Sequence, residues 1–170
     1  SPVSVHLVPL DIPGFGGIQS FASANYEGRW LLIGGRLDGL HRRQPWASFD
    51  IAGHNTTLTV ADPVSAEVWT RPLSDLPADI AEQLSSTNMQ FAQNGNYLYL
   101  IGGYGYSAQA DDHMTHPKLT AVYLPGAINA IVAGENPAQH FRQIENELLA
   151  VTGGYLHRLN GMYYLVGGHR

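Results

Sequence analysis

Cysteine is absent from the 170-residue chain. Without thiols the protein has no disulfide, no zinc–thiolate site and no cysteine nucleophile. The absence of cysteine does not indicate where the protein is located, because cysteine-free chains occur both inside and outside cells.

Charged residues and long apolar runs are also scarce. Only 14% of the residues are charged, and the formal net charge is -5, which argues against a general nucleic-acid-binding protein. No apolar run approaches the roughly 20 residues that a membrane-spanning helix needs. The first residues show no basic region followed by an apolar one, so we expect that a signal peptide is absent or already removed. We therefore expect neither a nucleic-acid partner nor a membrane span.

Apolar residues, glycine and proline are abundant instead. The chain is 44% hydrophobic and contains 19 glycines and 10 prolines, a composition that excludes disorder and a coiled coil and favours a turn-rich β protein. A chain of 18.5 kDa is long enough for one domain with a full-sized core.

Three segments repeat one pattern, and each ends in a glycine doublet. An alternating strand is followed by a turn with glycine, then by an apolar, aromatic-rich strand and the doublet, which is typical of a β-hairpin with a glycine stop. The doublets recur roughly every 65–68 residues. They are Gly34-Gly35, Gly102-Gly103 and Gly167-Gly168.

Two further strands follow each of the first two doublets. In the first unit they are predicted at 56–60 and 67–70, and in the second at 119–123 and 139–144. A four-stranded unit that repeats cannot bury both faces alone and must stack on its neighbours. A β-propeller meets this requirement.

These residues resemble the kelch repeat, the repeat of a β-propeller family that includes the central domain of galactose oxidase. The first unit matches best, with Gly34-Gly35, then Asp62-Pro63, and Trp69 in the fourth strand; the second has Phe141 in place of the tryptophan. Kelch units run about 50 residues, so roughly 15 extra residues fall in the loops of each unit. The resemblance implies an all-β, kelch-type β-propeller, with structural glycines at positive φ and with Trp69 packed between sheets.

The N-terminus reads as the fourth strand of a sheet whose first three strands lie elsewhere. Val5–Leu10 lines up with Val68–Leu73, and propellers often close their ring with a strand from one terminus. We predict one partial propeller domain of about 2.5 blades in an incomplete ring. Its parts are a closing strand at 1–12, blade 1 at 17–77, blade 2 at 78–145 and the first half of blade 3 at 146–170. The missing blades come from residues beyond Arg170 or from a second chain.

Short helices are expected between the strands. The segment 76–84 has proline near its start and apolar residues at i, i+4 spacing, which is typical of a helix. Similar turns are predicted at 145–150 and 125–134.

Two long loops carry most of the candidate ligand-binding residues. They run from Arg36 to Asn55 and from Tyr104 to Pro117, and strand alternation places both on one face of the ring. Arginine suits carboxylates and tyrosine suits a sugar or peptide face, and a third loop begins at the C-terminus. The candidates are Arg36, His41, Arg42, Arg43, Tyr104, Tyr106, His169 and Arg170.

One cluster has the residue types of a metal site, namely Asp111, His113 and His116. Imidazole and carboxylate suit several transition metals, but the spacing lacks the i, i+4 geometry of helical zinc motifs. A solvated polar loop explains the cluster more simply, and we predict no metal and no cofactor.

Three functions are compatible with these features. A binding module for a protein or glycan partner is favoured over an enzyme, because no catalytic constellation is visible. The alternatives are a carbohydrate-active or metal-dependent propeller enzyme, of the oxidase or sugar epimerase and mutarotase type, and a structural subunit of an envelope or extracellular assembly. A secreted, periplasmic or cell-surface location is expected, with a cytoplasmic one as the alternative.

Overall fold

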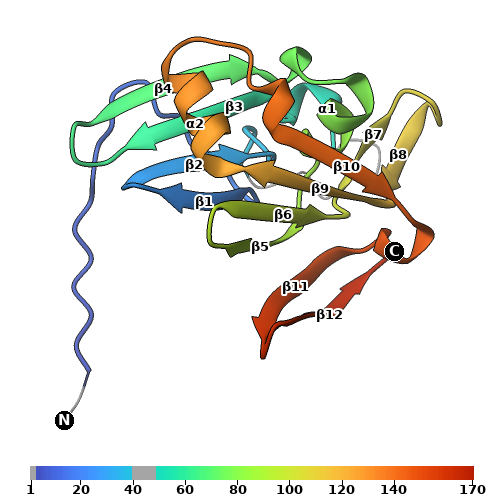
Figure 1. Cartoon of the computed structure of the whole chain (residues 1–170). Coiled ribbons are helices and arrows are strands. Elements are labelled where there is room, and N and C mark those ends of the chain that lie inside the picture. Colours follow the sequence, from blue (N-terminus) through green and yellow to red (C-terminus); the bar gives the residue numbers. More distant parts are fainter. Residues whose placement is uncertain (1–2, 40–48) are drawn as a thin grey trace.

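The chain folds mainly into antiparallel β structure (Figure 1). The computed structural model describes residues 3–39 and 49–170. Strands make up 45% of the structure and helices 18%, and none of the four sheets is closed among the described residues. Two sheets have four strands and two are hairpins. The prediction of an all-β protein is confirmed at this level.

The first sheet follows the chain order β1-β2-β3-β4. Its outer hairpin turns at Glu27-Gly28, both at positive φ, which is the conformation that tight two-residue hairpins require. In β2, Leu31 and Ile33 are fully buried, because this strand has a neighbour on each side. The strands are β1 (Ala22–Tyr26), β2 (Arg29–Ile33), β3 (Thr57–Asp62) and β4 (Glu67–Pro72).

The second sheet repeats this arrangement. Its spatial order is β10-β9-β6-β5, so β6, like β2, is the second strand in chain order and lies inside its sheet. The strands are β5 (Gln90–Asn94), β6 (Tyr97–Ile101), β9 (Lys118–Tyr123) and β10 (Phe141–Glu145). All four strands predicted for each of the first two units are therefore present, with ends shifted by a few residues.

Two hairpins complete the β structure. The C-terminal one pairs β11 (Thr152–Leu159) with β12 (Met162–His169), and β12 contains the third glycine doublet. The other pairs β7 (Tyr104–Ser107) with β8 (Asp112–Thr115). This second hairpin corrects the prediction of a loop at 104–117: its alternating residues pair with each other across a short turn in which Asp111 has positive φ.

Helices connect and cover the sheets. The predicted helix at 76–84 is present as α1 (Ala78–Leu84), and the turn predicted at 125–134 is α2 (Leu124–Val132). The expected turn at 145–150 is a 3-10 helix at Glu147–Leu149. Further 3-10 turns lie at Ile51–Gly53, Leu73–Asp75 and Ala138–His140.

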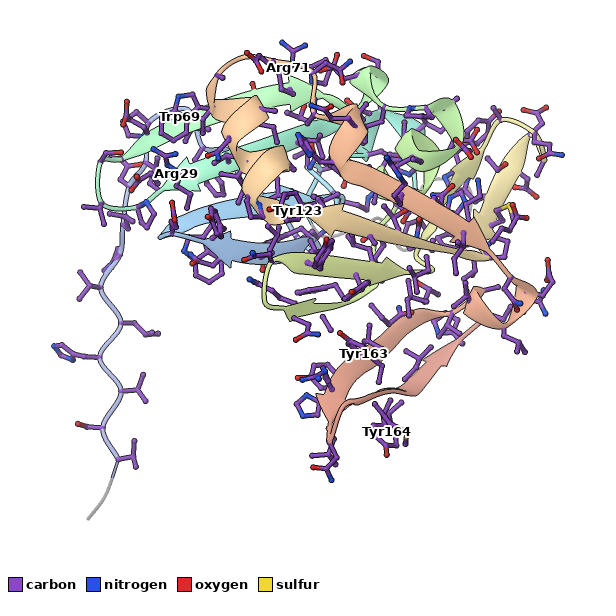
Figure 2. The ribbon with its side chains drawn as sticks, in the orientation of Figure 1. Arg29, Trp69, Arg71, Tyr123, Tyr163 and Tyr164 are labelled. Atoms are coloured by element: carbon purple, nitrogen blue, oxygen red, sulfur yellow. The ribbon has the colours of Figure 1, made fainter. Side chains whose placement is uncertain are left out.

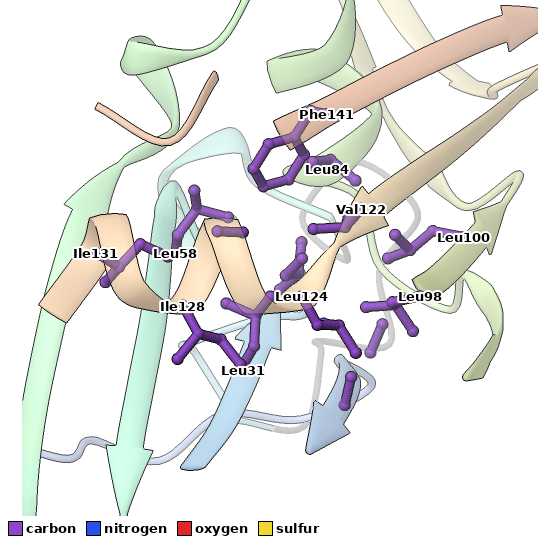
Figure 3. Packing of buried hydrophobic residues seen from close by; sticks show 14 of the residues in the cluster. Leu31, Leu58, Leu84, Leu98, Leu100, Val122, Leu124, Ile128, Ile131 and Phe141 are labelled. Atoms are coloured by element: carbon purple, nitrogen blue, oxygen red, sulfur yellow. The ribbon is translucent and has the colours of Figure 1, made fainter. Parts of the chain in front are cut away.

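The core lies between the two larger sheets and beneath α2 (Figure 3). Ile128 and Ile131 on α2 are buried in one cluster with Leu58 of β3 and with Val122 and Phe141 of the second sheet. Each large apolar side chain buried in this way contributes about 1.5–3 kcal/mol relative to its exposed state. The cluster therefore holds the two sheets and α2 together as one packed unit.

Trp69 lies at the edge of this core rather than in its centre. It is partly buried against the core cluster, and the Arg29 guanidinium lies over its ring at 5.4 Å from the centroid (Figure 2). A cation–π contact of this kind is worth about 0.5–1 kcal/mol at an exposed site. The expected structural role of Trp69 is consistent with this packing.

The glycine doublets occupy positions that other residues would not tolerate. All six glycines have positive φ, between 65° and 94°, as predicted. A Cβ at Gly35 would overlap the carbonyl oxygen of Gln19, and one at Gly103 would overlap the Ser86 hydroxyl. The first two doublets therefore directly follow β2 and β6, at places where neighbouring atoms lie very close.

The N-terminal segment pairs with no strand in the described part of the chain. Figure 1 shows it leaving the sheets as an extended segment, and Val5, Leu7 and Val8 are largely exposed. It does not add to β3, which pairs with β2 and β4. The prediction that Val5–Leu10 closes a sheet formed by other residues stays a prediction.

Among the residues described, no helix combines the length and the apolar character that crossing a membrane requires.

Candidate functional site

The segment that follows β2 is held in place by Arg36. Its backbone bridges to Gln19 on one side and to His54 on the other. Its guanidinium binds Asp38 through two bonds, Nε to Oδ1 at 2.9 Å and Nη2 to Oδ2 at 2.5 Å, and donates to the carbonyl oxygen of Asp50. Arg36 is only 2% exposed, and the carboxylate that it binds belongs to Asp38 of the same chain; that Arg36 binds a ligand stays a prediction. A buried guanidinium needs a charged partner, and Asp38 supplies it.

The two long connections meet through aromatic and imidazole rings. Tyr104 packs edge-on against Phe49, with 5.1 Å between ring centroids, and stacks on His113 at 5.8 Å. His113 in turn contacts His54 at 5.5 Å. The expectation that the connections after β2 and β6 lie on the same side of the molecule is therefore correct for their described residues.

Ser86 and His116 lie next to this contact. The Ser86 side chain sits against Gly103 and Gly105, and the His116 ring reaches the same glycine, Gly105. His116 also donates its backbone N–H to the carbonyl oxygen of Gly103. The two side chains are 0% and 1% exposed, because the glycines leave room for them under the backbone.

Four buried residues of this region share an unusual property: each has a side-chain polar atom with no hydrogen-bond partner in the described part of the chain. We call them the buried polar cluster, and the atoms are Arg36 Nη1, His54 Nε2, Ser86 Oγ and His116 Nε2. The Nε2 atom of the half-buried His113 also has no partner among residues 3–39 and 49–170. Buried polar atoms are nearly always bonded, and leaving one unpaired costs about 1–3 kcal/mol. A concentration of such atoms is therefore a candidate functional site.

The electrostatics of the cluster favour neutral imidazoles. Burial lowers the pKa of His54 to about 4, and the nearby Arg36 guanidinium acts in the same direction. Burial also lowers the pKa of His116 to about 4, with a further contribution from Lys118. The hydrogen bond from Arg36 lowers the pKa of Asp38 below its usual value. At neutral pH the ion pair is therefore complete, and both buried histidines offer one donor and one acceptor each.

The proposed metal ligands do not come together. Asp111 accepts a hydrogen bond from the Tyr106 hydroxyl at 2.6 Å, which raises the pKa of that tyrosine. His113 stacks on Tyr104, whereas His116 is buried against Gly105. Within residues 3–39 and 49–170 there is no group of three His, Asp or Glu side chains able to hold a metal ion.

The other predicted ligand residues are dispersed. His41, Arg42 and Arg43 lie outside the described residues. His169 is the last residue of β12, where it pairs with Thr152, and Arg170 forms an ion pair with Glu147. These two C-terminal residues are therefore part of the hairpin and its ion pair, and they do not join the buried polar cluster.

Sequence reasoning missed the role of Ser86. It stands in the connection between α1 and β5, which carries no recognisable motif, and its burial results from the close approach of Gly103 and Gly105. His54 belongs to a loop that was expected to bind a ligand, and its bridge to Arg36 depends on the fold. The only feature of the sequence that pointed to the region around Ser86 and His54 was the recurrence of glycine in the neighbouring segments.

Comparison with known proteins identifies no relative: no family model matches the chain, and no curated protein matches it at a significant level.

Proposed function

We propose that this chain is part of a kelch-type β-propeller that acts as a binding module. The first strands of three successive units are neighbours, since β1 contacts β5 and β5 contacts β11. Inner strands that follow one another in this way are what a propeller requires around its axis. The second strand of each unit also ends in the same glycine doublet.

The proposed binding face is the one on which the connections after β2 and β6 meet. The observation that supports it most is the buried polar cluster. Its His54 contacts the His113 ring, and its Ser86 and His116 lie against Gly105, the residue after Tyr104 in β7. Loops held by a rigid β scaffold are the usual place for binding residues. The partner we propose is a protein or a glycan that contacts the aromatic residues of this face. The predicted contribution of Arg42 and Arg43, which lie outside the described residues, is tested by substitution.

A binding screen with paired variants tests the face. The chain is applied to glycan and peptide arrays, and the best partner is titrated against the double variant Arg42→Ala/Arg43→Ala. The control, Arg29→Ala/Arg142→Ala, removes the same charge elsewhere; Arg29 lies beside Asp62, at the turn between β3 and β4. We expect the first variant to bind at least tenfold more weakly and with less dependence on salt. Loss of binding in the control alone would place the site on another face.

A further inference from the structure

Tyr97 and Tyr123 lie side by side on one face of the second sheet. Tyr97 of β6 is paired with Tyr123 of β9, and their ring centroids are 5.4 Å apart with 47° between the ring planes. The adjacent pair is joined through its backbone, since Leu124 donates its N–H to the carbonyl oxygen of Asn96. Tyr97 and Tyr123 therefore form a non-hydrogen-bonded pair, the kind in which opposite side chains come closest.

The face that carries this pair points away from the core. Leu98 and Val122, which are paired next along the same two strands, are both 0% exposed in the core cluster, and successive residues of a strand point to opposite faces. Tyr97 is 45% and Tyr123 is 39% exposed. Water and a dissolved oxidant therefore reach both phenols. Neither tyrosine belongs to the proposed binding face or to the buried polar cluster.

Two further tyrosines lie in the same row of rings. Tyr99 stacks beside Tyr97 on β6, with 6.4 Å between centroids and 21° between ring planes. It also contacts Tyr163 of β12 at 5.5 Å, with the rings at 67°. A bond between two phenol rings joins carbon atoms at their edges, whereas a T-shaped contact places the edge of one ring against the face of the other. The geometry therefore favours Tyr97 and Tyr123 as the pair that can be joined.

From this arrangement we infer that Tyr97 and Tyr123 form an oxidative cross-link. A one-electron oxidant, such as a haem peroxidase supplied with hydrogen peroxide, removes one electron from each phenol, and each phenol releases its proton to water. The two phenoxyl radicals join through the ring carbons next to their oxygens, and the hydrogens of these carbons move as protons to the oxygens, which restores both phenols. The peroxide takes up the two electrons and two protons and becomes two molecules of water.

The new bond ties together the two inner strands of the second sheet. β6 and β9 lie in the middle of the order β10-β9-β6-β5, and the segment between them contains the hairpin β7–β8. Closing this segment covalently restricts the unfolded chain, because its ends are then held together. The cross-linked form should therefore unfold at a higher urea concentration. The pair is thus a modification site that stabilises the sheet when an oxidant is present.

Peroxidase treatment of the 170-residue chain at low concentration tests the assignment. Trypsin cleaves after Lys118, between Tyr97 and Tyr123 in the sequence, so the cross-link appears as two tryptic peptides joined with the loss of two hydrogens and with dityrosine fluorescence. Tyr97→Phe and Tyr123→Phe should each lower the yield of this peptide pair at least tenfold. Both variants keep the aromatic ring at an exposed position, so they are expected to fold.

Two control variants separate this pair from the other tyrosines. Tyr155→Phe removes a more exposed tyrosine, at 67%, and Tyr99→Phe removes the neighbour on β6. Both should leave the yield unchanged. A link between Tyr99 and Tyr163 gives a different peptide pair, because trypsin also cleaves after Arg158.

Several results would overturn the inference. The peptide pair could persist in Tyr97→Phe or Tyr123→Phe, its yield could fall equally in Tyr155→Phe, or the main link could join Tyr99 to Tyr163. The treated chain could also contain no dityrosine, or only links between separate molecules, which appear as dimers on a denaturing gel. An unchanged urea midpoint of the cross-linked form would refute its stabilising effect.

Discussion

At Gly102 the backbone has both a conformation and a neighbour that exclude other residues. Its φ is +65°, and a Cβ would overlap the carbonyl oxygen of Val151, which accepts a hydrogen bond from Gly103. We predict that Gly102→Ala lowers the free energy of unfolding by about 3 kcal/mol or more, because strain and overlap add. Urea unfolding followed by circular dichroism measures the change.

The matched control for this prediction is Gly28→Ala. Gly28 also has positive φ, at +83°, but no atom of the described residues lies within 4 Å of the position that its Cβ would take. It should lose only the cost of the left-handed conformation, about 1–2 kcal/mol. Equal losses at both positions would show that the contact with Val151 does not matter.

The buried histidines predict how stability depends on pH. In the unfolded chain their pKa is near 6.5, whereas burial holds the pKa of both His54 and His116 at about 4. Between these values the unfolded chain binds protons that the folded chain does not. The free energy of unfolding should therefore fall as the pH drops from 6.5 to 4, by up to about 1.4 kcal/mol per pH unit for each histidine. Asp38 has a lowered pKa in the folded chain. Its protonation therefore lowers the free energy of unfolding further, at more acidic pH.

Denaturant unfolding between pH 4.5 and 7.5 provides the measurement. The double variant His54→Gln/His116→Gln should show a flatter dependence over this interval, since neither position then titrates. The groups that surround the two imidazoles, including Arg36, His113, Lys118 and Glu82, remain in place. His6→Gln, in the exposed N-terminal segment, should keep the original slope. A steep slope that survives in the double variant would assign it to other groups.

At the scale of elements, one buried side chain of α1 links the helix to the second sheet by hydrogen bonds. Gln83 is 0% exposed; its amide nitrogen donates to the carbonyl oxygen of Lys118 at 2.9 Å, and its oxygen accepts from the Thr120 hydroxyl at 2.6 Å and from the Gln143 amide at 3.0 Å. We predict that Gln83→Leu lowers the free energy of unfolding by about 3 kcal/mol, because several buried polar groups lose their partner.

Gln139→Leu is the control for α1. Gln139 is an exposed residue of the 3-10 turn before β10, so the same substitution should change stability by no more than about 0.5 kcal/mol. Thermal unfolding of both variants gives the comparison. If Gln83→Leu were as stable as Gln139→Leu, apolar packing alone would explain how α1 docks.

Most strands were predictable because their signal is local. The alternation in β3 and the apolar run in β6 follow directly from which side chains face the core, and proline before α1 marks a helix start. The hairpin β7–β8 was missed because its residues are polar and its glycine, Gly105, resembles a loop residue. Its pairing depends on the contact between Tyr104 and Thr87 in another segment.

The candidate site was predictable only as a region. The sequence indicates that the connections after the glycine doublets are long and rich in arginine, histidine and tyrosine. It does not indicate that Arg36 pairs with Asp38, because exposed and buried arginines look the same in a sequence. The burial of Ser86 depends on residues more than ten positions away, so no local pattern records it.

At the scale of the whole molecule, the hairpin β11–β12 differs from the corresponding strands of the two larger sheets. β2 and β6 each have a strand on both sides, whereas β12 pairs only with β11 among the described residues. Figure 2 shows Tyr163 on the side facing the second sheet and Tyr164 on the opposite side. Tyr163 contacts Tyr99 of β6, while Tyr164 and Val166 are exposed. The edge of β12 is therefore open and apolar.

An open strand edge with apolar side chains is a template for pairing with another chain. We predict that the 170-residue chain associates with itself in a concentration-dependent way through β12, which sedimentation velocity over a dilution series measures. The double variant Tyr164→Lys/Val166→Lys should shift the chain toward monomer, because lysine on an edge strand opposes pairing. Val64→Lys, at an equally apolar and 93% exposed position after β3, should leave association unchanged. Association that persists in the β12 variant but disappears with Val64→Lys would move the interface to the turn between β3 and β4.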